Sequence, residues 1–539
     1  MAARRLAVLF LGIGLVLSSC GEATDSADEV DADRELTVAV DTIGPGEWAP
    51  ARTGDDMQAV SKHLFSTLTR LDPKTGDFVG LLAESYAISD DGLTWTFKLR
   101  KDVPFHDDWG TVTAEDVKYS WEQWISEDSN HGYSDALSQA VDGDMNNFEV
   151  VDDLEFTVTA TEPVVTLDVI LSDSGNGLQV VPKKYYEQEG AKADEHPIGT
   201  GPWKFVSYKL GVEAVYEAVP DHFYKAPAFD RLVLKEVPDS AARLTQLQSG
   251  AVDMALLDSG LIGEATAAGL EVRKIPDVGN VFVILGGSYW GTENLDRDAP
   301  WIQADSPEKG KAVREAMSLA IDRQLILDKV LGGQGTLATG PVIQSEAVPA
   351  LRDPSAKPPT TDVNLAKQKL AEGGYPDGFD ITLFMYEDYV DLPGIGESIA
   401  GMWEQIGITV KRSPGEEGTL DAKLDKTDTD GWSWVKINGL KNNPMTQLNG
   451  YLSTRENDHK FFHPAIDDGF QRGMAEPDDD RRDVITREII ATLRDDFIVL
   501  TLFTIDLPTI VGPEVGDWKP LPGLDEMTAL ETVTPKGAG

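Results

Sequence analysis

The chain has 539 residues, of which 92 are acidic and 47 are basic, and its formal net charge is −45. Such a surface repels nucleic acid and anionic lipid headgroups, which makes both poor binding partners. A chain of this length is too large for one compact hydrophobic core, so we expect two or three lobes.

The amino-terminal residues have the pattern of a secretory signal. Arg4 and Arg5 precede the apolar run Leu6–Leu17, which is too short to cross a membrane as a helix. The sequence Leu-Ser-Ser-Cys that follows resembles the lipobox of bacterial lipoproteins. The resemblance implies that residues 1–19 are a signal peptide and that Cys20 carries the lipid. Cys20 is the single cysteine of the chain, which excludes a disulfide within the monomer.

Residues 20–34 are polar and acidic, and we expect them to form a flexible tether between the lipid and the fold. The fold begins with the predicted short strand Glu35–Val40. In Leu93–Leu99, apolar and polar side chains alternate, which predicts a half-buried strand. Thr113 precedes a helical pattern and can cap the free amides at the start of that helix.

Two strand–helix–strand units are predicted, well separated along the chain. The first runs from the strand Leu232–Val237 through a helix to the strand Val252–Leu256. The second runs from Phe379–Tyr386 through a helix to Ile408–Val410. A strand, a helix and a second strand that follow one another this closely along the chain imply a right-handed crossover between two parallel strands. The two units therefore predict two α/β lobes.

Four stretches, matching in order and spacing, resemble the family 5 extracellular solute-binding proteins, which include the oligopeptide, dipeptide and nickel binders. They are Leu93–Trp121, Ile198–Tyr208 continuing through Val219–Met254, Val313–Gly335, and Leu365–Leu383. The resemblance covers nearly all of the chain after the signal peptide. It implies a large, two-lobed α/β fold of the type II periplasmic-binding-protein kind. An extra subdomain would be inserted in the first lobe, and crossing strands would form a hinge.

The resemblance also implies the domain boundaries. Lobe I would comprise residues 35–65, 190–283 and 500–539, with the inserted subdomain at 66–189 and lobe II at 284–499. We place the hinge crossings near Val281–Leu285 and Phe497–Thr504, because both are apolar, strand-like runs. Closure about this hinge would hold a ligand between the lobes.

The function implied by the resemblance is capture of an oligopeptide or peptide-like solute outside the cytoplasm. The solute would pass to the permease and ATPase subunits of an ATP-driven (ABC) importer. We expect a monomer that is anchored to the outer face of the bacterial cell membrane by its lipid alone. Two alternatives stay open: a receptor or sensor lipoprotein without a transport role, and capture of a sugar-like, nickel or haem ligand.

The sequence offers only weak candidates for an enzyme site. The chain has no HExxH, no GxSxG and no GxxxxGK[ST]. Gly333–Ala338 loosely matches a dinucleotide loop, but it follows a predicted helix instead of a strand. His459 and His463 could share a helix face, yet Pro464 follows them and no further ligands accompany them. We therefore expect no catalysis, no metal site and no cofactor.

A cleft that binds a solute needs aromatic walls and a few polar anchors. Three segments of the sequence offer them, one after the first strand, one after the presumed first crossing and one in the second lobe. They are Glu47 with Trp48, Tyr289 with Trp290, and Trp432 with Trp434.

The segment Trp434–Pro444 departs from the pattern of the peptide binders in the family. Those proteins carry an aspartate there, in a D-Y-x-x-P context, that pairs with the terminal ammonium of the peptide. Here the segment has no acidic residue and contains Lys436. Either another carboxylate, from Glu47, Glu387 or Asp388, holds an ammonium, or the ligand has none. We predict the second case, in which a modified peptide, a sugar-like or an anionic solute is anchored by Lys436 and stacked on Trp432 or Trp434. An ordinary peptide held by backbone contacts also stays open.

Overall fold

The structure is a computed structural model. It describes residues 34–49, 52, 57–72, 74, 75, 77–129, 131–174, 177–287, 295–342, 355–386, 391–424, 426–439, 445, 448, 464–520 and 527–537. Cys20 and the predicted signal peptide lie outside the described residues. Within the described ranges, every helix is too short or too polar to cross a membrane.

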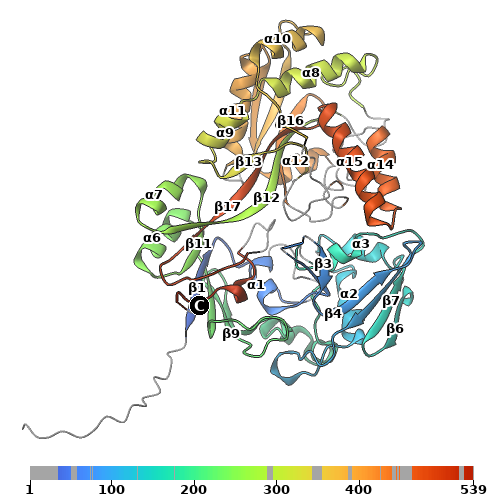
Figure 1. Ribbon diagram of the computed structural model, residues 1–539, viewed down its shortest axis with the longest axis vertical. Helices are drawn as coiled ribbons and strands as arrows, with labels where there is room; N and C mark the ends of the chain where they lie inside the picture. Colours follow the sequence, from blue (N-terminus) through green and yellow to red (C-terminus); the bar gives the residue numbers. More distant parts are fainter. Residues whose placement is uncertain are drawn as a thin grey trace, which may run out of the picture.

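Two lobes are joined by the long strands β12 (Glu271–Leu285) and β17 (Leu500–Val511), which cross between them in Figure 1. Both strands belong to one large sheet with the order β15-β14-β16-β12-β17-β11-β1-β10-β9-β8, and β13 also pairs with β17. A single sheet therefore extends through both lobes. This arrangement confirms the predicted two-lobed α/β fold with crossing strands.

Lobe I contains the first of the predicted strand–helix–strand units. Its strands are β1 (Glu35–Val40), β8 (Trp203–Lys209), β9 (Glu213–Ala218), β10 (Arg231–Glu236) and β11 (Met254–Leu256), and its helices include α1 (Gln58–Leu64), α6 (Ser240–Ser249) and α7 (Ile262–Ala267). β1 lies between β10 and β11 and pairs with both in parallel. The helix α6 joins β10 to β11. The carboxylate of Asp239 accepts a hydrogen bond from the Ala242 N–H at 2.7 Å and so caps α6.

A four-stranded antiparallel sheet, with the order β4-β5-β7-β6, lies within the range predicted for the inserted subdomain. Its elements are β4 (Ala83–Ile88), β5 (Thr94–Leu99), β6 (Phe148–Asp152), β7 (Glu155–Thr159), α2 (Ala114–Trp124), α3 (Ser134–Gln139), α4 (Leu167–Ile170) and α5 (Lys183–Glu189), beside the pair β2 (Thr69–Leu71) and β3 (Phe78–Gly80). The alternating run predicted as a strand is β5. The helix α2 begins after Thr113, whose N–H donates to the Asp116 carboxylate at 2.9 Å.

Lobe II contains the second unit. Its strands are β13 (Gly335–Leu337), β14 (Asp380–Tyr386), β15 (Thr409–Gly415) and β16 (Trp432–Gly439), and its helices are α8 (Pro307–Leu319), α9 (Arg323–Lys329), α10 (Val363–Glu372), α11 (Leu392–Glu404), α12 (Glu417–Leu424), α14 (Pro464–Met474) and α15 (Asp479–Asp495). β14 pairs in parallel with both β15 and β16, and α11 joins β14 to β15. The stretch Gly333–Ala338, which loosely matches a dinucleotide loop, contains β13, a strand that pairs with β17.

Two large hydrophobic cores show where the crossing strands pass from one lobe to the other. Ile275 and Val278 of β12 belong to the core that lobe I shares with the inserted subdomain. Val281–Leu285 and Leu500 belong to the core of lobe II. The passage thus lies near Gly279, a few residues toward lobe I from the predicted crossings. The apolar runs from which we predicted the crossings are the parts of the two strands that are buried in lobe II. The stretch of β12 that passes between the lobes is irregular and more polar.

The pairing of β12 with β17 is interrupted between Ile275 and Gly279. Pro276 has no N–H to donate to the ladder, and Asp277 takes a left-handed backbone conformation with φ of 58°. The carboxylate of Asp506 accepts a hydrogen bond from the Asp277 N–H at 3.3 Å, and it forms an ion pair with Lys274 Nζ at 3.2 Å. This bulge is the local feature that would allow the two strands to bend.

Candidate functional site

A cavity of about 390 Å³ lies between the two lobes, beside the crossing strands. It is within the size range of pockets that bind small ligands. Asp41 follows β1, Pro238 lies just beyond β10, and Asp258 lies just beyond β11, and all three residues line the cavity. In open α/β sheets, ligands bind outside the carboxyl ends of the parallel strands. The cavity is therefore the candidate ligand site.

Polar groups from both lobes meet in this cavity. The hydroxyl of Ser259 in lobe I donates a hydrogen bond to Oδ2 of Asp391, the residue that precedes α11 in lobe II, at 3.3 Å. Burial raises the pKa of Asp391; the Ser259 hydrogen bond opposes this shift and the negative charge of Asp258 adds to it. A positive group beside these two carboxylates would favour their charged forms.

The cavity wall presents more acceptors than donors. Gln334 is 8% exposed, and its Oε1 has no hydrogen-bond partner among the described residues. Arg243 also lines the cavity, but its guanidinium donates to the backbone carbonyls of Leu256 at 2.7 Å and Val237 at 2.8 Å. A ligand that donates N–H groups and carries positive charge would therefore complement this wall.

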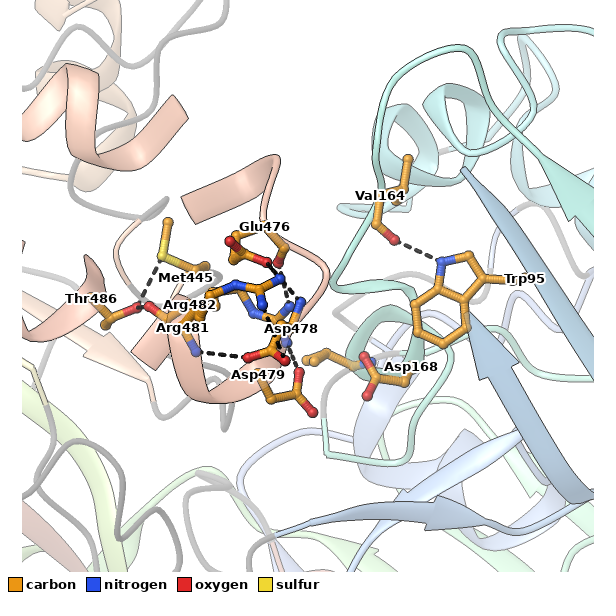
Figure 2. Close-up of polar contacts among 11 residues, drawn as sticks. Trp95, Val164, Asp168, Met445, Glu476, Asp478, Asp479, Arg481, Arg482 and Thr486 are labelled. Atoms are coloured by element: carbon orange, nitrogen blue, oxygen red, sulfur yellow. Dashed lines mark hydrogen bonds and ion pairs between the residues drawn. The ribbon is translucent and has the colours of Figure 1, made fainter. Parts of the chain in front are cut away.

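The lobes also meet at a second place, where the turn between α14 and α15 approaches the inserted subdomain (Figure 2). A Cβ added to Gly92 would lie 3.1 Å from Pro163 and 3.5 Å from Pro477, which belong to the two sides of this contact. Asp168 of the inserted subdomain faces Arg482 and Asp479 of lobe II. Burial raises the pKa of Asp168 to about 7, with the Arg482 charge opposing the shift and the Asp479 charge adding to it.

The structure places Trp48 and Glu47 in lobe I but not in the wall of the inter-lobe cavity. Trp48 is only 1% exposed and packs edge-on against the rings of Phe205 and Tyr208, with centroids 5.5 and 5.9 Å away. Glu47 is exposed, and its carboxylate lies 3.9 Å from the guanidinium of Arg52. A ligand would reach the Trp48 ring only if this packing changed.

Trp432, Trp434 and Lys436 alternate along β16 and so project from the same face of that strand. Trp434 is 1% exposed within the core of lobe II. Trp432 is half-buried, with Nζ of Lys423 4.4 Å above its ring, and Lys436 is also half-buried. Ile437, which projects from the opposite face, is the β16 residue that lines the cavity.

Four further predicted site residues, Tyr289, Trp290, Glu387 and Asp388, lie outside the described residues. Sequence reasoning missed Asp258, Ser259, Asp391 and Gln334 as candidates. Asp258 and Ser259 could have been found by the criterion that selected Glu47, because they are polar residues in the loop after a strand. In the described parts of the chain, no group of three His, Cys, Asp or Glu side chains is arranged to hold a metal ion.

Comparison with known proteins gives a consistent result. The family model for bacterial extracellular solute-binding proteins, family 5 (Middle), matches residues 77–459. Heme-binding protein A of Haemophilus influenzae is 27% identical over 469 residues, which cover 80% of each chain. Glutathione-binding protein GsiB of Escherichia coli is 27% identical over 431 residues, which cover 79% of this chain and 76% of the relative.

Solved structures share the fold. HbpA2 from Haemophilus parasuis has a TM-score of 0.76 at 21% identity and covers 93% of this chain and 100% of its own. DppA from Helicobacter pylori, in complex with the peptide STSA, has a TM-score of 0.71 at 19% identity and covers 93% of this chain and 98% of its own. These two likenesses support the two-lobed architecture.

Proposed function

The chain belongs to the family 5 bacterial extracellular solute-binding proteins, and from this premise we propose that it captures a peptide-like solute between its lobes for an ATP-driven importer. Members of the family are extracytoplasmic substrate-binding proteins of transporters and not enzymes. The observation that carries the proposal is the cavity of about 390 Å³ between two lobes that are joined by β12 and β17.

Ligand capture would proceed by closure of the lobes about the bulge of β12. A ligand in the cavity contacts lobe I at Asp258 and lobe II at Asp391, so it binds the closed form better than the open form. This difference in affinity shifts the population toward the closed form. The closed complex would then dock on the permease, and the ATPase subunits would drive release and import.

The proposed solute is an oligopeptide or a smaller peptide-like compound with a free ammonium. The acceptors of the cavity support this choice, because Asp258, Asp391 and the buried Oε1 of Gln334 can receive N–H groups. Relatives are named for binding glutathione and heme, and solved structures of the same fold hold peptides and a nickel–histidine complex. Glu387 and Asp388 precede Asp391 in the chain and are proposed to add to the same acceptor wall.

A second version of the ligand proposal uses different residues. If the solute has no free amine, Lys436 is the proposed anchor, with Trp432 or Trp434 as the stacking surface. Tyr289 and Trp290 complete the proposed contact residues in either version, and Trp48 and Glu47 would join them only after a local rearrangement of lobe I. Because the Trp434 ring is covered by the core of lobe II, this version requires a rearrangement of β16 or its neighbours.

The proposal places the protein outside the cytoplasm, on the outer face of the bacterial cell membrane. Its support is the basic, apolar and lipobox-like order of residues 1–20. In this proposal Cys20 carries the lipid, residues 20–34 are the tether, and the protein is a monomer. The boundaries proposed above for lobe I, the inserted subdomain (66–189) and lobe II are part of the same proposal.

Calorimetry with one peptide library in free and amino-acetylated forms tests the proposed ligand. We expect the free peptides to bind and acetylation to weaken binding at least tenfold, since it removes the ammonium. Asp391→Asn should reduce the affinity for free peptides and leave that for acetylated peptides unchanged. Equal affinity for both forms would contradict the ammonium site and favour Lys436. Haemin and the nickel–histidine complex, titrated in parallel, test the alternative ligands.

A further inference from the structure

A second, smaller cavity of about 70 Å³ lies within lobe I and the inserted subdomain. It adjoins the inter-lobe cavity, because His63 lines both. Burial lowers the pKa of His63 to about 3, so this shared side chain is neutral at physiological pH. Charged side chains from distant parts of the sequence line the small cavity: Lys62, Arg70, Asp173 and Glu531.

Arg70 is the unusual member of this group. The residue is only 7% exposed, and its guanidinium makes no hydrogen bond or ion pair with any described residue. The guanidinium lies over the ring of Tyr224, whose centroid is 4.1 Å from Cζ. The guanidinium nitrogens are not among the fully buried polar atoms that lack a partner, so they are open to the cavity, and the planar fork of Arg favours a bidentate acceptor such as a carboxylate. A cavity beside such a group is suited to an anion.

Two carboxyl groups line the same cavity without contacting the guanidinium of Arg70. Burial raises the pKa of both Asp173 and Glu531, and the positive charge of Arg70 opposes the shift in each case. No ion pair within 4.0 Å joins either of them to Arg70 among the described residues. Oγ1 of Thr528, which is 3% exposed, also lines the cavity and has no partner in the described part of the chain.

A purely structural role would be to tie the carboxy-terminal segment 527–533 to lobe I. Such a network would gain most if the guanidinium and the carboxylates were in direct contact, because hydrogen bonds to charged groups weaken steeply with distance. Here the guanidinium of Arg70 and the carboxyl groups of Asp173 and Glu531 line the same cavity without direct contact. The arrangement matches a ligand that itself carries both charges.

We propose that this cavity binds the α-amino-acid group of the solute, with Arg70 holding its carboxylate and Asp173 and Glu531 receiving its ammonium. The inference rests on the proposed function and narrows its solute to a peptide joined through a side chain, because a linear peptide has no free α-amino-acid group. The rest of the solute, with a second ammonium for Asp391, would extend past His63 into the inter-lobe cavity. The size agrees. About 70 Å³ exceeds the roughly 10–15 Å³ that one water requires, which leaves room for a small charged group beside Arg70.

The test uses L-alanine as the probe and saturation-transfer NMR on the purified full chain. L-Alanine should bind, whereas propionate, which lacks the ammonium, and ethylamine, which lacks the carboxylate, should each bind at least tenfold more weakly. Arg70→Gln should weaken L-alanine binding at least tenfold. Arg70→Lys, which keeps the charge but loses the fork, should fall between. Arg231→Gln, an equal change of charge at an exposed pair with Glu35, should have no effect.

Circular dichroism of each variant shows whether it has folded, and Arg70→Lys keeps the test valid if Arg70→Gln has not. The proposal is overturned if L-alanine does not bind, if both Arg70 variants bind it as the wild type does, or if inorganic phosphate binds better than L-alanine. These outcomes differ from failure of the proposed function, in which no member of the peptide library binds or closes the lobes.

Discussion

The hydroxyl of Ser259 in lobe I and the carboxylate of Asp391 in lobe II form a hydrogen bond of 3.3 Å across the cleft. It joins the start of a short helical turn, Ser259–Leu261, to the amino-terminal end of α11. The structure therefore represents a form in which the lobes touch at the cavity that would hold the ligand. This contact allows closure to be tested with single substitutions.

Removal of this bond should favour the open form. Ser259→Ala deletes the donor and leaves a half-buried carboxylate without it, which should cost the closed form about 1 kcal/mol. We expect a larger radius of gyration in solution scattering and about fivefold weaker binding of the peptide library by calorimetry. Ser249→Ala, which removes an exposed hydroxyl that bonds only within its own helix, is the matched control. Unchanged scattering in Ser259→Ala would show that the bond does not hold the lobes together.

The passage between the lobes should be sensitive to added volume at Gly279. A Cβ there would lie 2.7 Å from Cγ2 of Ile437 on the neighbouring strand, so Gly279→Ala should force β12 and β16 apart. We expect the free energy of unfolding to fall by about 1–3 kcal/mol in urea denaturation. Gly263→Ala, in α7 with nothing within 4 Å of the added Cβ, should be neutral or stabilising. Equal stability of the two variants would rule out tight packing at Gly279.

The contact at Asp168 should make closure depend on pH. Burial raises the pKa of this carboxyl to about 7, and Tyr86, Arg482 and Asp479 are the charged or titratable groups that interact with it. We expect the turn before α15 to supply part of that burial, so that closing takes up a proton at Asp168. The closed form should thus be most stable near pH 4 and lose stability as the pH rises toward 7. Scattering between pH 4 and 8 should show this opening.

The corresponding variant removes the titrating group. Asp168→Asn keeps the shape of the side chain but cannot ionise, so the change in scattering between pH 4 and 7 should disappear. Asp152→Asn alters an exposed carboxylate of the same subdomain and should retain the wild-type profile. If Asp168→Asn also keeps that profile, another group is responsible for any dependence on pH.

The lipid anchor is tested in cells. Cys20→Ala removes the only sulfur atom that could carry a diacylglycerol, so the protein should leave the membrane fraction or accumulate with its signal peptide attached. Fractionation and mass spectrometry of the amino terminus distinguish these results. A variant that stays membrane-bound and correctly cleaved would show that Cys20 is not the anchor.

Features that depend on local spacing were determined by the sequence. The alternation in Leu93–Leu99 became β5, Asp239 caps α6, and each predicted strand–helix–strand unit is present in its lobe. Side-chain periodicity and helix capping depend on residues only a few positions apart, so they can be predicted from the sequence without the tertiary structure. The family resemblance followed from the same local patterns, taken in order.

The tertiary structure alone decided which polar and aromatic residues share a site. Trp48 and Trp434 were plausible cleft residues by type, but each is buried in the core of its lobe, because aromatic side chains suit both environments. Arg70 and Glu531 line one cavity although 460 intervening residues separate them in the chain. Which side chains meet there depends on how the crossing strands and the two cores pack, and no local pattern records that long-range packing.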